Sequence, residues 1–168
     1  KKEKKVTEKL SLVPISTYNK TKMIAERVLL SFKNKIKIFS IRPATVCGFS
    51  PRMRLDVSVN NLTFQAIKKK EIVVFGGKQI RPNIHIVDLC RIFEHIISKE
   101  SISPGIYNAG FENLSILQIA KKIAKKTKTK IKILRNSNDP RTYRLNSNKL
   151  LSTGFKKLYS VDDAIDEI

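Results

Sequence analysis

Several features that would point to particular protein classes are missing from this sequence. It has no tryptophan, only two cysteines and no long apolar run. A membrane-spanning helix needs about 20 consecutive apolar residues, so no such helix is predicted. Cys47 and Cys90 are far apart and lack metal-ligand spacing, which argues against a disulfide framework or a metal site and favours a reducing, cytoplasmic location. The charged residues 1–9 precede no apolar segment and do not read as a secretory signal.

Acidic residues are also scarce. Fourteen Asp and Glu stand against 34 Lys and Arg, which gives a formal net charge of +20. Such a charge can indicate binding to the phosphates of nucleic acids. However, the basic residues are spread over nearly every segment, are not interleaved with aromatic residues, and 25 of the 34 are lysines. This pattern favours solvated faces over a nucleic-acid partner.

A glycine-rich phosphate loop is absent as well. The one glycine doublet, Gly76-Gly77, lies between expected strands and lacks the G-x-G-x-x-G spacing. What the chain does contain is an alternation of amphipathic and short apolar segments. Helices are expected at 18–32, 57–69, 87–98 and 115–126, strands at 35–42, 71–75, 80–86, 106–108 and 131–134, a loop at 136–140, and short helices near 146 and 161. This alternation predicts an α/β fold.

Five expectations concern packing and local structure. The helix at 18–32 is predicted to have one apolar face, and strand 35–42 is predicted to be largely buried. His85, in an apolar strand, is interpreted as a structural histidine that forms hydrogen bonds. Asp88 is expected to cap the helix that follows, and Cys90 is expected to lie in the core.

Tyr18 and Lys22 are the first candidates for chemistry. Residues four apart at the start of a helix project from one face, about one turn apart. A lysine ammonium this close to a phenol favours the phenolate form. That form is what a tyrosine needs to act as a general base on a hydroxyl group, although the pair on its own also arises by chance.

Four segments in order strengthen this interpretation. They are the segment 14–22 with Glu26 behind it, the segment Ile41-Arg42-Pro43-Ala44-Thr45-Val46-Cys47-Gly48, the loop and helix at 50–62, and the segment Arg81-Pro82-Asn83-Ile84-His85-Ile86-Val87-Asp88. Together they resemble the extended short-chain dehydrogenases/reductases of the NAD-dependent epimerase/dehydratase family, which modify nucleotide sugars. Two departures, Cys47 where many members have Tyr and Phe49 where they often have Pro, leave the sugar open.

The resemblance implies roles for individual residues. Tyr18 would be the acid/base, and Lys22 would bind the nicotinamide ribose of NAD or NADP. A nucleotide-diphospho-sugar would be the substrate, and the whole protein would form a homodimer. The expected cofactor strip is Pro43, Ala44, Thr45 and Val46, and the expected substrate contacts are Asn60 or Asn61, Arg81 and Arg141.

The resemblance also implies that part of the family's pattern lies outside this chain. The family's serine or threonine, about 24 residues before the tyrosine, would precede Lys1, and its dinucleotide-binding loop would lie further upstream. The chain is therefore expected to be the C-terminal half of such an enzyme, inactive alone. Residues 1–47 and 78–98 would belong to the Rossmann-like domain, and 48–77 and 99–168 to the substrate-binding domain. The alternatives are a split-gene subunit that needs an N-terminal partner and a basic nucleic-acid-binding module.

Overall fold

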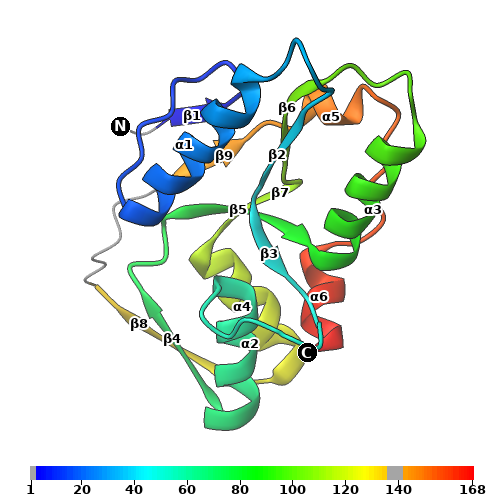
Figure 1. The fold of residues 1–168 in the computed structure, drawn as a ribbon. Helices are drawn as coiled ribbons and strands as arrows, with labels where there is room; N and C mark the ends of the chain where they lie inside the picture. Colours follow the sequence, from blue (N-terminus) through cyan, green and yellow to red (C-terminus); the bar gives the residue numbers. More distant parts are fainter. Residues whose placement is uncertain (1–2, 136–141) are drawn as a thin grey trace.

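The expected α/β fold is confirmed by a computed structural model that describes residues 3–135 and 142–168 (Figure 1). The helices are α1 (Thr17–Ser31), α2 (Ser58–Lys69), α3 (Ile86–Ser98), α4 (Ile116–Thr127), α5 (Asn148–Leu151) and α6 (Val161–Glu167). The strands are β1 (Glu3–Val6), β2 (Phe39–Pro43), β3 (Thr45–Cys47), β4 (Glu71–Phe75), β5 (Ile80–His85), β6 (Gly105–Ala109), β7 (Glu112–Ser115), β8 (Lys130–Leu134) and β9 (Tyr143–Leu145). None of the helices in these ranges is long and apolar enough to cross a membrane.

The strands form four small groups, and most of the pairing is parallel. β2 pairs with β6, β4 with β8, β1 with β9, and β3 with β5, all in parallel, while β7 adds to β5 in the antiparallel direction. β2 and β3 are one nearly continuous extended run, separated only by Ala44. The chain therefore leaves the β2–β6 pair and joins β5 within a single residue.

Two apolar cores lie on either side of this extended run. The first is built from α2, α4, α6 and β4, and includes Ile72, Val74, Ile119 and Ile123. The second lies under α3 and includes Ile84, Ile92, Tyr107 and Leu150. Figure 1 shows α2, α4 and α6 grouped together and α3 on the opposite side of β2 from α1.

Local capping chemistry explains why the helices begin where the sequence predicts. Ser16 accepts a hydrogen bond from the backbone N–H of Asn19 at the start of α1. Ser115 and Gln118 form a reciprocal capping box at the start of α4, as the predicted cap requires. Each cap satisfies a backbone donor that has no partner within the helix.

Helix α1 differs from the expectation of a buried face. It contains no buried residue, whereas α3 and α4 bury Ile92 and Ile119 completely. Its apolar side chains remain about half exposed, and they are Ile24, Val28, Leu29 and Phe32. Strand β2, beside it, is only half-buried where the sequence predicted a largely buried strand.

Two single-residue expectations were wrong. Asp88 does not cap α3, because His85 occupies the N-cap position and accepts from the N–H of Val87. Asp88 instead lies buried in the first turn of the helix and accepts hydrogen bonds from the backbone of a distant segment. Cys90 is exposed rather than in the core. The structural role expected of His85 agrees with its hydrogen bonds to Val87 and Glu167.

The predicted division into two domains remains a prediction. One of its boundaries disagrees with the strand pairing. Residues 105–109 were predicted, as part of 99–168, to belong to the substrate-binding domain. As β6, this segment pairs with β2 along its whole length and joins the core under α3. The loop expected at 136–140 lies outside the described residues.

Candidate active site

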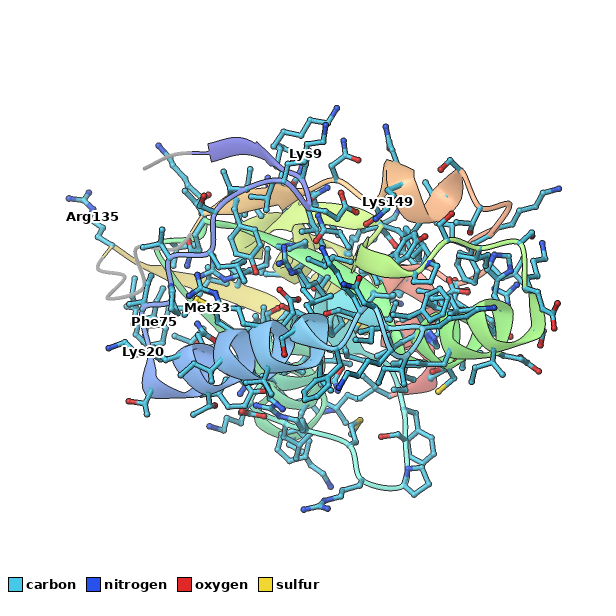
Figure 2. The ribbon with its side chains drawn as sticks, turned by 45° about the horizontal axis from the view of Figure 1, so that its top comes forward. Lys9, Lys20, Met23, Phe75, Arg135 and Lys149 are labelled. Carbon is cyan, nitrogen blue, oxygen red and sulfur yellow. The ribbon has the colours of Figure 1, made fainter. Side chains whose placement is uncertain are left out.

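The Tyr18–Lys22 pair lies at the N-terminal end of α1, and its two side chains meet as the spacing predicts. The Nζ atom of Lys22 is 5.5 Å from the centre of the Tyr18 ring. Tyr18 is 66% exposed, so its hydroxyl is open to a ligand. Figure 2 shows α1 from its outer side, with its residues Lys20 and Met23 labelled.

The pair borders a hollow of about 680 Å³, here called the α1–β2 groove. One wall is the side of α1, another is the loop 12–14, and the floor is β2 from Ser40 to Pro43. Pro43, the first residue of the predicted cofactor strip, therefore lies in the same hollow as Tyr18 and Lys22.

Glu26 fastens α1 to β2. Its carboxylate accepts hydrogen bonds from the Ser40 hydroxyl at 2.7 Å and from Nε of Arg42 at 2.9 Å, and it forms an ion pair with the same guanidinium. Among the described residues, it is the only α1 side chain that forms a hydrogen bond outside the helix and its cap. Arg42 holds the pKa of Glu26 below its usual range, against the opposing effect of burial.

Replacing Glu26 with Gln is expected to loosen α1 while the rest of the chain stays folded. The loss of a charge-assisted hydrogen bond costs about 1.5–3 kcal/mol, and amide hydrogen exchange should therefore quicken in residues 18–30 but not in α3. The pKa of Glu26 is lower in the folded chain than its unfolded value of 4.5. The stabilisation of the fold by the Glu26–Arg42 pair is therefore complete above pH 4.5, and it is lost as the pH falls through the folded pKa.

The matched variant is Arg42→Met, and Glu26→Gln with Arg42→Met completes a double-mutant cycle. The pair should show a coupling free energy of about 1 kcal/mol or more. The role given to Glu26 would be contradicted if the two single substitutions changed the free energy of unfolding additively. It would also be contradicted if amide hydrogen exchange in α1 stayed unchanged.

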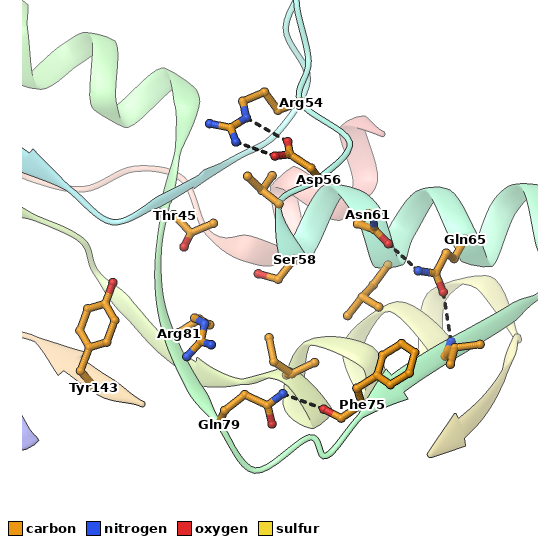
Figure 3. Close-up of a pocket in the computed structure, with 14 residues that line it drawn as sticks. Thr45, Arg54, Asp56, Ser58, Asn61, Gln65, Phe75, Gln79, Arg81 and Tyr143 are labelled. Atoms are coloured by element: carbon orange, nitrogen blue, oxygen red, sulfur yellow. Dashed lines mark hydrogen bonds and ion pairs between the residues drawn. The ribbon is translucent and has the colours of Figure 1, made fainter. Parts of the chain in front are cut away.

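A second hollow of about 630 Å³, the α2–β5 cavity, lies beyond the loop that follows β3 (Figure 3). Its walls come from β3, β5, β9, the start of α2 and the strand β4. The residues that line it are Thr45, Arg54, Asp56, Val57, Ser58, Asn61, Leu62, Gln65, Val73, Phe75, Gln79, Arg81, Ile116 and Tyr143.

Arg54 lines the α2–β5 cavity and lies within electrostatic range of Tyr18. Its guanidinium donates two hydrogen bonds to Asp56 at the mouth of the α2–β5 cavity, at 2.9 and 2.6 Å. The pKa of Arg54 is raised, first by these bonds and the charge of Asp56 and then, more weakly, by the charge of Tyr18. Tyr18 is thus within electrostatic reach of the second cavity.

The predicted substrate residues are distributed unevenly around this cavity. Arg81 and Asn61 line it, and the amide of Asn61 also donates to the carbonyl of Leu55 at 2.8 Å. Asn60 is buried and holds the preceding loop, because its amide accepts from the N–H of Gly48 at 3.2 Å and donates to the carbonyl of Arg54 at 3.0 Å. Arg141 lies outside the described residues.

The predicted cofactor strip divides between two faces because side chains alternate along a strand. Thr45 faces the α2–β5 cavity, while Ala44 and Val46 pack with the core under α3. Pro43 alone of the four lines the α1–β2 groove. The structure thus brings Tyr18, Lys22 and Pro43 together, and it brings Thr45, Asn61 and Arg81 together in the neighbouring cavity.

Sequence reasoning did not single out several residues that line the cavity. Tyr143 comes from β9 and Phe75 from the end of β4, and nothing local marks either as a ligand contact. Ser58 is notable because its hydroxyl is buried and has no hydrogen-bond partner among the described residues. A buried hydroxyl normally has a partner, so Ser58 offers a position for a polar ligand atom.

The described ranges contain no cluster of three or more His, Cys, Asp or Glu arranged to hold a metal ion. The chemistry available here comes from an exposed phenol beside an ammonium, and from arginine, amide and hydroxyl groups around a cavity. This combination suits proton transfer at one end of a ligand and anion recognition at the other.

Comparison with known proteins identifies the class. Residues 1–110 match the NAD dependent epimerase/dehydratase family, and the chain belongs to that family. A curated relative, the uncharacterized UDP-glucose epimerase YtcB of Bacillus subtilis (strain 168), is 32% identical over 122 residues, which cover 70% of this chain and 38% of that protein.

Solved structures agree with the fold. UDP-glucuronic acid 4-epimerase from Bacillus cereus, in complex with UDP-glucuronic acid and NAD, is 26% identical with a TM-score of 0.82, over 98% of this chain and 55% of that one. The dTDP-glucose 4,6-dehydratase from Bacillus anthracis, in complex with NAD, has a TM-score of 0.83 at 19% identity, over 99% of this chain and 55% of that one, which supports the fold alone. The chain thus spans little more than half the length of these solved relatives.

Proposed function

We propose that this chain carries the Tyr–Lys pair and the substrate cavity of an NAD-dependent enzyme that epimerises or dehydrates a nucleoside-diphosphate sugar. The observation that carries the proposal is the contact between Tyr18 and Lys22 at the α1–β2 groove, in a chain whose second cavity is lined by Arg81 and by a Ser58 hydroxyl without a partner among the described residues. The Bacillus relatives are named for UDP-glucose and UDP-glucuronic acid, which supports this substrate class.

The residues of the α1–β2 groove fit the nicotinamide end of NAD or NADP. The exposed ammonium of Lys22 can donate hydrogen bonds to ribose hydroxyls, and Pro43 offers an apolar surface beside it. NAD, when bound, supplies the acceptor for the hydride that leaves the sugar carbon and can return it.

Tyr18 acts at the sugar hydroxyl. Its phenolate oxygen removes the proton as the hydroxyl carbon is oxidised to a ketone, and it can give the proton back when the ketone is reduced. Lys22 lies 5.5 Å from the ring and stabilises the negative charge on the phenolate. The exposure of Tyr18 lets a sugar reach it from the side of Arg54.

The α2–β5 cavity holds the nucleotide. The planar guanidinium of Arg81 can form two parallel hydrogen bonds to phosphate oxygens. Thr45, Asn61 and Ser58 provide further polar groups around the same space, and the exposed ring of Phe75 offers a flat apolar surface for a base (Figure 3). We include Arg141 as a second diphosphate ligand and assign Asn60 to the support of the loop above.

The assembled enzyme requires a dinucleotide-binding segment in addition to these 168 residues. The sequence has no G-x-G-x-x-G loop to receive the pyrophosphate, and the relatives are much longer than the region they share with this chain. We therefore propose that the chain corresponds to the C-terminal portion of such an enzyme, with the remainder joined to it or supplied as a separate polypeptide. Homodimer formation and a cytoplasmic location remain predictions.

Replacing Ser58 with Ala tests the assignment of the cavity. The change should weaken binding of UDP-glucose or UDP-glucuronic acid by about 5- to 10-fold, because a hydrogen bond contributes about 0.5–1.5 kcal/mol. It should leave the free energy of unfolding unchanged, because the hydroxyl has no partner among the described residues. Isothermal titration calorimetry and urea denaturation measure the two effects.

Ser152→Ala is the matched control, since this serine caps the C-terminal end of α5 and, among the described residues, its hydroxyl bonds only to the carbonyl of Lys149 in the preceding turn. Its binding should equal that of the parent chain. If Ser58→Ala binds as tightly as Ser152→Ala, or if the parent chain binds neither UDP-sugar, the proposed cavity is wrong.

A further inference from the structure

A third hollow, of about 490 Å³, lies between α3 and the chain that follows α5, and we call it the α3 pocket. Figure 1 shows the chain between α5 and α6 running alongside α3, and hydrogen bonds from Arg91 and His95 to residues 156 and 153 join the two walls. Arg91, His95 and Lys99 are spaced four residues apart, so they project from one side of the helix. The pocket shares no lining residue with the α1–β2 groove or the α2–β5 cavity.

Positive charge predominates in the α3 pocket. Arg91, Lys99 and Lys156 are cations at neutral pH, and Glu94 is the only acid among the described residues that line it. In the part of the chain that the structure describes, the side chains of Lys99 and Lys156 form no hydrogen bond or ion pair. Gly154 keeps the space around one of these ammonium groups open, because a Cβ there would lie 3.6 Å from Nζ of Lys99. Two ammonium groups are therefore available to an anion.

Arg91 is held in place before any ligand binds. Its Nη1 atom donates to the buried carboxylate of Asp88 and to the carbonyl of Lys156. Its guanidinium also lies 5.3 Å from the centre of the Phe155 ring. A guanidinium has five N–H donors, so the Nε and Nη2 groups of Arg91 remain for a ligand.

His95 lies between Arg91 and Lys99 on α3 and can respond to an anion. The Thr153 hydroxyl has one proton, which it donates to the carbonyl of Leu150 at 2.7 Å. This hydroxyl therefore accepts the hydrogen bond from Nε2 of His95 at 2.9 Å, and Nδ1 is the atom that binds a second proton. Burial and the charges of Lys99 and Arg91 lower the pKa of His95. An opposite charge nearby would favour the protonated ring instead.

We propose that the α3 pocket is an anion site that binds the phosphate group of a small phosphate monoester, such as a sugar phosphate. The ammonium groups of Lys99 and Lys156 and the remaining N–H groups of Arg91 supply charge-assisted hydrogen bonds. The only apolar side chain that lines the pocket among the described residues, Phe155, is buried, so the pocket offers no exposed apolar surface for a nucleobase. The hydroxyl of Ser98 suits a polar remainder of the ligand.

Binding of the anion is coupled to protonation of His95. The charged groups that line the pocket around its ring are Arg91, Glu94 and Lys99 on α3 and Lys156 on the opposite wall. An anion opposes the three cations and favours the protonated ring, which raises the pKa of His95. By reciprocity, protonation of His95 tightens anion binding, so the affinity rises as the pH falls through the pKa of this ring.

The chain contains only two histidines, so nuclear magnetic resonance can follow each imidazole during a pH titration. Sulfate is the first probe, because it stays a dianion across the titration, and the ionic strength is kept constant with chloride. Sulfate is expected to raise the pKa of His95. It should leave the signals of His85 unchanged, because His85 contacts Glu167 and does not line the pocket. Glucose 6-phosphate is the second probe, and its affinity is measured from the His95 signals.

Three variants test the named residues. Lys99→Gln with Lys156→Gln should weaken binding of glucose 6-phosphate by about tenfold or more, because two charge-assisted contacts are lost. Glu94→Gln should strengthen binding about two- to fivefold, because a charge that repels the anion is removed, and unfolding cannot produce such a gain. Lys130→Gln with Lys132→Gln is the matched control, because it removes the same charge from β8, which does not line the pocket. The affinity of this control should stay within about twofold of the parent.

Three results overturn the proposal. The first is a sulfate titration that changes neither histidine, or changes both alike. The second is an equal loss of affinity in the β8 control, which would show that the anion responds to the overall charge of +20. The third is equal affinity for inorganic phosphate and glucose 6-phosphate, which would assign the pocket to the free anion and not to a monoester. The outcome is separate from that of the proposed function, because the α3 pocket and the α2–β5 cavity share no residue.

Discussion

Asp88→Ala is expected to lower the free energy of unfolding by about 3–5 kcal/mol, because it removes several hydrogen bonds to a buried charged group, each worth about 1.5–3 kcal/mol. Asp88 is fully buried and accepts from the backbone N–H of Leu158 and of Tyr159, at about 3 Å, while pairing with Arg91. Alanine leaves the two backbone donors without this acceptor, while Arg91 keeps its hydrogen bond to the carbonyl of Lys156. Urea denaturation followed by circular dichroism measures the loss.

Two further variants make the result interpretable. Glu94→Ala, on the exposed side of the same helix, should change stability by no more than about 0.5 kcal/mol. Asp88→Asn keeps an acceptor for the two backbone donors and should fall between the parent and the alanine variant, so a measurement remains possible if Asp88→Ala does not fold. A loss below about 1 kcal/mol for Asp88→Ala would show that the 157–160 segment is held by other contacts.

Tyr18→Phe is expected to have the largest effect on activity. When a dinucleotide-binding segment is supplied to the chain, turnover of UDP-glucose or UDP-glucuronic acid in the presence of NAD should fall by about 10²- to 10⁴-fold, the usual contribution of a general acid/base. The phenyl ring keeps the shape and the contact with Lys22 but removes the proton-transferring oxygen.

The controls separate chemistry from assembly and binding. The Phe variant should bind the UDP-sugar as the parent does, and the isolated parent chain should turn over neither substrate with NAD or NADP. Turnover of the Phe variant within threefold of the parent would remove Tyr18 from the mechanism. Turnover by the isolated chain would show that it holds the cofactor without a further segment.

How far the sequence predicts the fold depends on how local the determinants are. Ser16 and Ser115 cap α1 and α4, and such caps are visible in the sequence because a capping hydrogen bond involves residues only three apart. Strand β3 was missed because its three residues, Thr45–Cys47, are extended only through pairing with Asn83–His85, nearly forty residues away. A segment of this length has no period of its own to detect.

The same distinction applies to the candidate site. The Tyr18–Lys22 contact follows from helix geometry and was predictable. The packing of α2 decides which of two adjacent asparagines faces the cavity. Asn60 accepts a hydrogen bond from the loop at Gly48, and Asn61 lines the cavity. Ser58 and Tyr143 carry no local signal, because they meet only when α2 and β9 are both placed around β5.

The apolar face of α1 shows another limit. Its periodicity correctly indicates which side of the helix is apolar. It contains no information about what covers that side, and the structure leaves Val28 and Leu29 exposed. An amphipathic pattern therefore predicts a surface that favours burial, and only the arrangement of neighbours tells whether the chain buries it alone.

The passage of one extended run from β2 into β3 has a consequence for how the molecule melts. Ala44 lies between a strand that belongs to the core under α3 and a strand whose Cys47 belongs to the core around α2 and α4. Loss of packing in either core would displace the peptide units around Ala44, and this displacement would disturb the packing of the other core. We therefore expect the two cores to unfold together in a single cooperative transition. A cofactor-binding side and a substrate-binding side would then differ in function but not in stability.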